Sequence, residues 1–357
     1  MAYTTIDDSE AYFQCVTWTG NGSNARTITL PGTTDMQPDF IWVKNRTDAE
    51  DHCLMDVVRT FAVDKAMRSN GADEEGGVGT TARGWVQATS DGVGCYNGST
   101  NANLVNASSD LYVAWNWKAG TSFSNDASST SVGSIDSAGS VSTAAGFSIM
   151  SYTGTGSTAT FAHGLGAVPK MIIFKNRTVG GSQWDTYHHN VGTAHRLYLE
   201  ATSAKASATN FINNTAPTSS VITVGDATHT NGDGNSHIAY CFAEKQGYSK
   251  FGSFVASNPV FVHCGFKPAF VMIKRHTATG NWHMLDNKRI LPFNPQDPLY
   301  ANANTAEQTD DHYDLVSNGF VVRNAAGGGG GDSGTAIFMA FAESPFVNSN
   351  GVPTTAR

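Results

Sequence analysis

The chain has 357 residues, of which 22 are Lys or Arg and 30 are Asp or Glu, so its formal net charge is −8. The chain is acidic overall and has no cluster of basic residues that could bind a phosphate backbone. No nucleic-acid partner is therefore expected. No apolar run reaches the ~18 residues that a membrane span needs, so no membrane insertion is expected. Charged residues make up only 15% and glycine occurs 37 times, a composition typical of a folded, β-rich and loop-rich protein.

The first ten residues are partly acidic and lack an apolar stretch, so no signal peptide is expected. Five cysteines are widely spaced and form no CxxC pair. This pattern favours synthesis in a reducing cytoplasm, and it is not typical of a disulfide scaffold or a zinc site.

Two short signatures recur three times along the chain. The first begins with proline, continues with large apolar residues and ends near a lysine, at residues 38–46, 169–177 and 268–275. The second is an apolar and aromatic run at residues 113–118, 239–244 and 338–343. The lysine of the first lies 73, 67 and 67 residues before the last aromatic residue of the second. Such similar spacings of two independent signatures indicate three copies of one unit of about a hundred residues.

Both signatures predict strands that are buried on both faces, because they are short apolar runs bounded by turn-forming residues. No long stretch has helical periodicity, and antiparallel strands without covering helices must pack sheet against sheet. The sequence therefore predicts an all-β fold of three tandem antiparallel, jelly-roll-like β-sandwiches. The expected repeats are residues 1–120 (repeat 1), 146–246 (repeat 2) and 247–346 (repeat 3), followed by a polar tail at 347–357.

Residues 121–145 are almost entirely Ser, Thr, Ala, Gly and Asp. This composition predicts a flexible linker between repeats 1 and 2. The spacing of Val132, Ile135 and Val141 also fits an extended strand laid along a neighbour. Both alternatives remain open from the sequence.

Several segments together resemble a known repeat family. They lie at residues 18–23, 38–46, 114–120, 239–252 and 340–345. In this combination the chain resembles an uncharacterised repeat domain of structural proteins from marine tailed bacteriophages, often found near lectin-like modules. The resemblance covers roughly residues 9–346 and implies a non-enzymatic virion protein, made in the bacterial host cytoplasm, that forms a tail or fibre-type appendage. No catalytic residue carries over from it.

The same resemblance leaves two alternative functions open, a capsid decoration or head-fibre protein and a glycan-degrading depolymerase. Its expected partners are other virion proteins and further copies of the chain, since phage appendages are usually homo-oligomers. The sequence contains no coiled-coil heptads, so self-association is expected to use sandwich faces, strand edges or residues 121–145.

Two motifs resemble catalytic or metal sites without their usual context. Residues 331–334 read Gly-Asp-Ser-Gly, as in chymotrypsin-like proteases, and His195 lies in a matching histidine motif. Repeat 2 has a glycine-rich turn at the position of this Gly-Asp-Ser-Gly, so a turn is expected there. Residues 327–332 match a calcium-binding β-roll motif once, whereas that motif works in tandem; a glycine loop is favoured and a calcium ion remains the alternative. No metal, cofactor or catalytic residue is expected.

A pair of opposite charges recurs in two of the repeats. Asp56 and Arg59 in repeat 1 match Asp286 and Arg289 in repeat 3, and repeat 2 lacks the pair. A catalytic acid and base could have this spacing. Recurrence in two copies of one unit favours structural ion pairs instead.

Aromatic residues are the best candidates for ligand contact. Trp184 and Trp282 follow the lysine-ended strand by 9 and 8 residues, and His52 holds the comparable place in repeat 1. These rings either present a platform for a sugar or complete their own core, and the core is favoured because the rings recur with the scaffold. Of the loops that differ between repeats (64–94, 179–215 and 292–311), the second is favoured for weak, multivalent contact with a host surface glycan. The candidate contacts are Trp184, Tyr187, His188, His189, Arg196, Tyr198 and Trp282.

Overall fold

The structure is a computed structural model that describes residues 3–289, 297–309, 312–323 and 334–354. Within these ranges the regular structure is almost entirely antiparallel β-sheet, so the all-β prediction is confirmed. The described residues contain only four short helical segments, and none is long and apolar enough to cross a membrane. The helices are η1 (Ser9–Ala11), α1 (Thr80–Arg83), α2 (Ala127–Thr130) and α3 (Thr228–Asn231).

Repeat 1 folds as two antiparallel sheets packed face to face. The larger sheet has the strand order β1-β7-β3-β4 and the smaller one β2-β6-β5. Apolar side chains between the two sheets form a core that belongs to this repeat alone. The strands are β1 (Phe13–Thr19), β2 (Arg26–Thr29), β3 (Phe40–Asn45), β4 (Cys53–Asp56), β5 (Trp85–Thr89), β6 (Gly92–Tyr96) and β7 (Leu111–Trp117).

Repeat 3 has the same strand order in both sheets. Its larger sheet is β18-β25-β20-β21-β22 and its smaller sheet is β19-β24-β23. The strands are β18 (Ser249–Val255), β19 (Val260–His263), β20 (Phe266–Arg275), β21 (Trp282–Asp286), β22 (Leu299–Tyr300), β23 (Tyr313–Val316), β24 (Gly319–Val322) and β25 (Thr335–Pro345).

The larger sheet of repeat 2 contains the same four central strands and adds strands at both edges, whereas its smaller sheet has two strands instead of three. Its larger sheet has the order β15-β14-β13-β12-β17-β10-β9-β8, and its smaller sheet pairs β11 with β16. The strands are β8 (Thr121–Asn125), β9 (Ser137–Ser142), β10 (Phe147–Thr153), β11 (Ala159–Ala162), β12 (Met171–Asn176), β13 (Asp185–His188), β14 (His195–Tyr198), β15 (Ala206–Ser207), β16 (Val221–Val224) and β17 (Ser236–Phe242).

The strand registers of the three repeats match residue for residue. The two recurring signatures are neighbouring strands at the centre of each larger sheet, where Phe40 pairs with Trp117, Met171 with Phe242 and Phe270 with Phe341. A position in one repeat can therefore be compared directly with its equivalents in the other two. The internal repetition inferred from the spacing is a repetition of topology.

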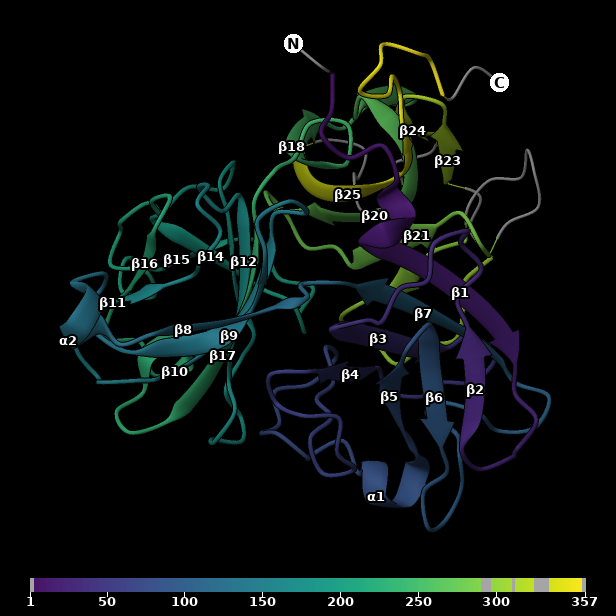
Figure 1. Cartoon of the computed structure of the whole chain (residues 1–357), viewed down its shortest axis with the longest axis horizontal. Helices are drawn as coiled ribbons and strands as arrows, with labels where there is room; N and C mark the ends of the chain where they lie inside the picture. The colour runs from purple at the N-terminus through teal and green to yellow at the C-terminus, as the bar shows by residue number, and fades with distance from the viewer. Residues whose placement is uncertain (1–2, 290–296, 310–311, 324–333, 355–357) are drawn as a thin grey trace.

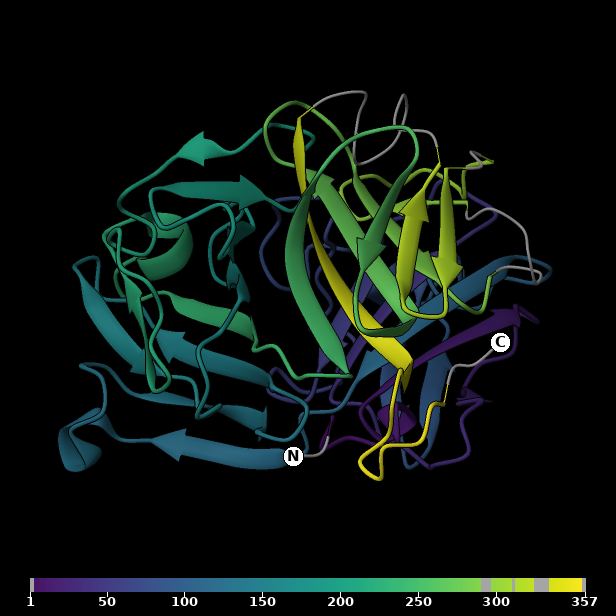
Figure 2. The same cartoon turned by 90° about the horizontal axis from the view of Figure 1, so that it is seen from above.

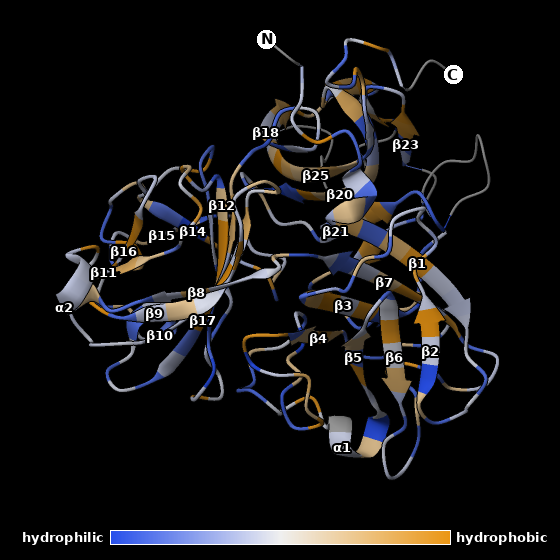
Figure 3. Ribbon diagram, viewed as in Figure 1, coloured by the Kyte–Doolittle hydropathy of each residue, from blue (hydrophilic) through white to orange (hydrophobic). Residues whose placement is uncertain are grey.

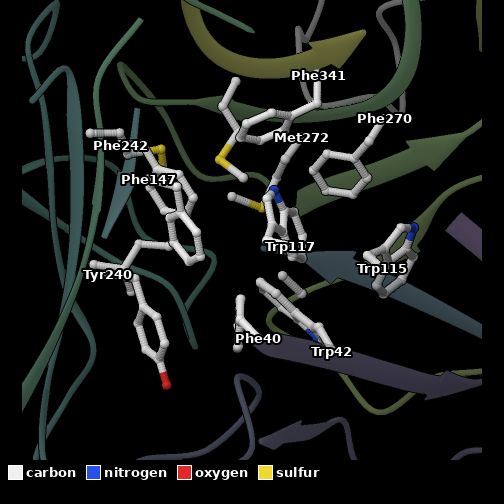
Figure 4. Packing of buried hydrophobic residues seen from close by; sticks show 14 of the residues in the cluster. Phe40, Trp42, Trp115, Trp117, Phe147, Tyr240, Phe242, Phe270, Met272 and Phe341 are labelled. Atoms are coloured by element: carbon white, nitrogen blue, oxygen red, sulfur yellow. The ribbon is translucent and has the colours of Figure 1, made fainter. Parts of the chain in front are cut away.

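The three larger sheets turn one face toward a common centre, which Figures 1 and 2 show from two directions. One hydrophobic cluster draws on all three repeats, while three further clusters each lie inside a single repeat. In the shared cluster the ring of Phe40 lies 4.6 Å from that of Tyr240 (Figure 4). The ring of Phe13 lies 5.2 Å from that of Phe341. The repeats are thus tandem in sequence but packed around one core, and the jelly-roll part of the prediction is not confirmed.

The central strands explain why this arrangement forms. Every residue of β3 and of β12 is buried, and both strands are coloured as hydrophobic in Figure 3. One face of each strand packs on the small sheet of its own repeat, and the other face packs on the shared cluster. Because a two-sheet sandwich covers only one of these faces, each repeat needs the other two.

Residues 121–145 contain two strands, β8 and β9, with the short helix α2 between them. β9 pairs with β10 from Ser142 opposite Phe147 to Ser137 opposite Tyr152, and β8 pairs with β9. The small residues allow a close approach: a Cβ atom on Gly139 would lie 1.8 Å from the carbonyl oxygen of Ile149. Small residues, which are typical of flexible linkers, here allow two backbones to pack closely against each other.

We expect the substitution Gly139→Ala to lower the free energy of unfolding by about 2 kcal/mol or more, because the added methyl group meets backbone that cannot move aside. Ala138→Ser on the same strand is the matched control, since Ala138 is exposed, and it should change stability by less than about 0.5 kcal/mol. Urea unfolding followed by circular dichroism measures both. Equal stability of the two variants would show that β9 is not held against β10 in solution.

Candidate functional site at the repeat interfaces

Each repeat reaches across to the preceding one through the same position. The Trp184 Nε1–H of repeat 2 donates to the carbonyl oxygen of Arg68 in repeat 1, at 3.0 Å. The Trp282 Nε1–H of repeat 3 donates to the carbonyl oxygen of Tyr198 in repeat 2, at 2.9 Å. His52 of repeat 1 completes the cycle, with Nε2 3.0 Å from the carbonyl oxygen of Tyr300 in repeat 3. The three contacts, at the 1/2, 2/3 and 3/1 interfaces, close the repeats into a ring.

The lysine that ends each central strand is buried beside these contacts. Lys44, Lys175 and Lys274 are completely buried. Lys175 Nζ donates to the carbonyl oxygen of Ala72 across the 1/2 interface (3.1 Å), and Lys274 Nζ donates to that of Thr202 across the 2/3 interface (2.9 Å). Burial lowers the pKa of Lys44 and Lys175 to about 8 and that of Lys274 to about 7. The ammonium groups are thus solvated by backbone carbonyls instead of water.

Buried ion pairs extend the 1/2 interface. Arg59 Nε lies 2.5 Å from Asp56 Oδ2, and both side chains are fully buried. Glu75 contacts Arg59 at 3.4 Å and also contacts Arg177 of repeat 2 at 2.9 Å. The hydroxyl of Tyr240, also from repeat 2, donates to Asp56 at 2.7 Å.

The 3/1 interface repeats this network with equivalent residues. Arg289 contacts Asp286 and Glu307, both at 2.6 Å, and Glu307 contacts Arg46 of repeat 1 at 2.7 Å. Trp115 Nε1–H of repeat 1 donates to Asp286 at 3.0 Å. Both charge pairs singled out from the sequence are therefore structural, and each receives a hydrogen bond from the next repeat.

The 2/3 interface carries none of these ions at the equivalent positions. Backbone hydrogen bonds identify the equivalent positions. The backbone N–H of Lys205 donates to the carbonyl oxygen of His276. In the same way the N–H of Glu75 donates to that of Arg177, and the N–H of Glu307 to that of Arg46. Five positions have changed together. His188 lies where the other interfaces have the buried aspartate, and Val191 lies where they have its paired arginine. Lys205 takes the place of the glutamate, and His276 takes the place of the arginine across the interface. Met339 takes the place of the aromatic hydrogen-bond donor.

The structure places most of the sequence-predicted contact residues inside the molecule. Trp184 and Trp282 are 0% and 1% exposed and belong to the shared core, and Tyr187 and His188 are buried as well. None of these four side chains is therefore exposed for ligand contact, and Trp184 and Trp282 complete a core, as the favoured interpretation of the sequence expects. Recurrence with the scaffold was the signal that favoured this interpretation.

The remaining three contact candidates are half-buried. His189 Nε2 lies 3.0 Å from the carbonyl oxygen of Phe251, at the 2/3 interface. Arg196 contacts Asp185 at 2.9 Å and lies over the ring of Tyr198, 5.0 Å from its centroid. Arg196 and Tyr198 are the only part of the predicted contact set that lies together with some exposure.

One aromatic pair on the surface was missed by the sequence reasoning. Of the seven tryptophans, Trp85 alone is not classed as buried. Its ring stacks on that of Tyr96 at 4.6 Å, and Gln87 Nε2–H donates to the Tyr96 hydroxyl at 2.6 Å. Alternation along residues 85–89 indicates a half-buried strand with Trp85 and Gln87 on the same face, and this signal could have identified the pair.

A carboxyl group stands where the other two repeats have an amide. Asn70 and Asn302 each accept a hydrogen bond from the backbone N–H of the interface residue, His52 or Trp282. Glu200 does the same for Trp184 at 3.1 Å. Burial raises the pKa of Glu200 to about 7. A protonated carboxyl group both donates and accepts, as the amide does, so the site favours the neutral acid.

We expect Glu200→Gln to raise the free energy of unfolding at pH 8.5 by about 2 kcal/mol. This is less than the free energy that corresponds to the whole pKa shift, because the carboxyl group is partly solvated. The folded-state pKa is raised, so the stability that the proton supplies is fully present below the unfolded pKa and is lost as pH rises through about 7. The gain should therefore shrink at pH 6. Urea unfolding at both pH values tests this, with the exposed Glu74→Gln as control, and a pH-independent difference would contradict it.

Some sequence motifs lie outside the described residues. They are the Gly-Asp-Ser of residues 331–333, the β-roll match at 327–332 and part of the loop 292–311. Among the residues that are described, no group of three or more His, Cys, Asp or Glu is placed to hold a metal ion. A depression of about 20 Å³ between repeats 1 and 3, lined in part by Gln14, Lys288 and Glu343, has room for about one water molecule.

The fold defines a closed ring of three β-sandwich repeats around one core. The chain belongs to the family described as Domain of unknown function (DUF7483), whose model matches residues 8–345 and so spans all three repeats. No match was found among curated proteins.

The two classes of tryptophan give opposite expectations for mutation. Trp184→Ala removes a fully buried ring and its hydrogen bond across the 1/2 interface, so it should lower the free energy of unfolding by about 3–5 kcal/mol. Trp85→Ala should cost less than about 2 kcal/mol, because that ring is half-buried. Urea unfolding measures both changes. A small loss for Trp184→Ala would mean that the ring is not closed as described.

Proposed function

We propose that the chain is a non-enzymatic structural protein of a tailed-bacteriophage virion, of tail or fibre type. The observation that carries this proposal is the closed ring: the positions that recur in all three repeats are used to build interfaces and cores. A ring that buries its own repeated interfaces is a rigid building block, and such a block supports a scaffolding role. The resemblance of the recurring segments to phage structural repeats supplies the virion setting.

Host contact, in this proposal, is made by outward groups that differ between the repeats. The pair of Trp85 and Tyr96 in repeat 1 and the pair of Arg196 and Tyr198 in repeat 2 combine a partly exposed ring with polar neighbours. A sugar stacked on one such ring gains only about 1–2 kcal/mol, so attachment to a host glycan would depend on several copies acting together. Self-association and contact with other virion proteins are part of the proposal for this reason.

Immunogold labelling of intact phage particles, with an antibody raised against the purified chain, tests the assignment. We expect label at the tail or its fibres. Label over the head would replace this assignment with a capsid decoration protein, and its absence from purified particles would overturn the virion role.

A depolymerase is the rival function from another class. Incubation of the purified chain with host polysaccharide should release no reducing ends. Release that is lost in Glu200→Gln, but not in Glu74→Gln, would contradict a purely structural role.

A further inference from the structure

Repeat 3 is attached to repeat 2 through a histidine that must be neutral. His188 Nδ1 accepts a hydrogen bond from the backbone N–H of Asn190, and Nε2 faces the carbonyl oxygen of Phe338 in repeat 3, both at 3.3 Å. Only the neutral ring protonated on Nε2 serves both partners. A second proton, on Nδ1, would point at the N–H of Asn190 and break that bond.

At the 3/1 interface, beside the ions that join Glu307 to Arg289 and Arg46, lies a second histidine of the same kind. His52 Nδ1 accepts a hydrogen bond from Trp42 Nε1–H at 2.8 Å. Its Nε2 faces the carbonyl oxygens of Tyr300 and Ala303 in repeat 3, at 3.0 and 3.2 Å. Both rings are fully buried, so neither could gain a proton and keep its hydrogen bonds or its solvent-free surroundings.

The charged groups around the 2/3 interface are mainly basic. His188 faces His189 and His276, and His276 in turn faces Lys205 and His195. Neither ring nitrogen of the buried His276 has a hydrogen-bond partner among the described residues.

His189 and His52 also have charged neighbours. His189 faces Lys170, Lys250 and one carboxylate, Glu244, which Lys250 already contacts at 2.9 Å. His52 faces Lys44 and Asp51. A proton added at the 2/3 interface therefore meets more positive than negative charge.

The 1/2 interface is held by other groups. Its crossing contact is Trp184, and its ion network joins Glu75 to Arg177 and Arg59. No histidine crosses this interface in the hydrogen bonds of the described residues. Repeats 1 and 2 should stay together under conditions that charge the histidines.

We propose that mild acid releases repeat 3 from the pair formed by repeats 1 and 2, because both of its interfaces, unlike the 1/2 interface, contain a buried histidine that must stay neutral. Release uncovers the face that repeat 3 turns to the shared core, including Phe270, Met272 and Phe341. The chain thus contains a switch from a closed ring to an open form with an apolar surface. The proposal concerns a conformational property and does not depend on the virion assignment.

The direction of the pH dependence follows from linkage. Burial lowers the pKa of His52 and of His188 to about 3, below the value near 6.5 of an open chain. The closed form is therefore fully favoured above pH 6.5 and loses stability as pH falls toward the folded-state value. For each histidine that must stay neutral, the ratio of closed to open molecules falls up to tenfold per pH unit.

Hydrogen exchange resolved by segment, measured from pH 7.5 to pH 4.5, tests the proposal. We expect protection in β18, β21 and β25 to be lost at a higher pH than protection in β3, β7, β12 and β17. Binding of an apolar dye should rise in parallel. Simultaneous loss in all three repeats would overturn the proposal, and it would point instead to histidines inside single repeats, such as His237 and His283, whose pKa burial lowers to about 4 and about 3.

Variants that cannot be protonated sharpen the test. Glutamine offers a donor and an acceptor, so the double variant His52→Gln/His188→Gln should move the opening of repeat 3 down by at least one pH unit. His263→Gln, at an exposed position of the same repeat, should leave the opening unchanged. If the double variant is not folded at pH 7.5, His276→Gln alone should still lower the opening pH. Opening of the tested variant at the wild-type pH would overturn the proposal.

Discussion

Each repeat contains central strands with two apolar faces, and a two-sheet sandwich can cover only one of them. The uncovered faces of β3, β12 and β20 are too large to leave in water, since burying a large apolar side chain is worth about 1.5–3 kcal/mol. Packing three such faces together satisfies all of them at once. The shared aromatic cluster, the order of the repeats and the closure of the ring are consequences of this one requirement.

Closing the ring places backbone at the interfaces where water is excluded, and its polar groups need partners there. The side chains at the recurring tryptophan, histidine and lysine positions meet backbone carbonyl oxygens across the interfaces: Trp184 meets that of Arg68, and Lys274 meets that of Thr202. A carbonyl that accepts from a side chain of the next repeat satisfies one repeat and orients the other. The recurring lysine and tryptophan are thus explained by the interfaces and need no ligand.

Much of this architecture could be predicted from the sequence. The features that could not be predicted were hidden for identifiable physical reasons. Recurring spacings revealed three copies and the strands at their centres, because those strands must form the same core in each repeat. Trp184 and Trp282 were open to two readings because a sequence does not show which loops meet across an interface. Residues 121–145 stayed open because a strand of small residues in close contact, as at Gly139, has the composition of a linker. Trp85 was overlooked because it occurs outside the recurring segments.

The three interfaces differ in whether they bury an aspartate, and the presence of a buried hydrogen-bond donor explains the difference. Where Tyr240 or Trp115 offers a buried donor, the facing position is an aspartate with its arginine. Where Met339 offers none, a lone aspartate would be buried without enough partners, at a cost of several kcal/mol, and His188 with Val191 stands there instead. Loss of the donor, the acid and the paired base is therefore one correlated change. It leaves the 2/3 interface without the carboxylate and guanidinium pairs that join the repeats at the other two interfaces.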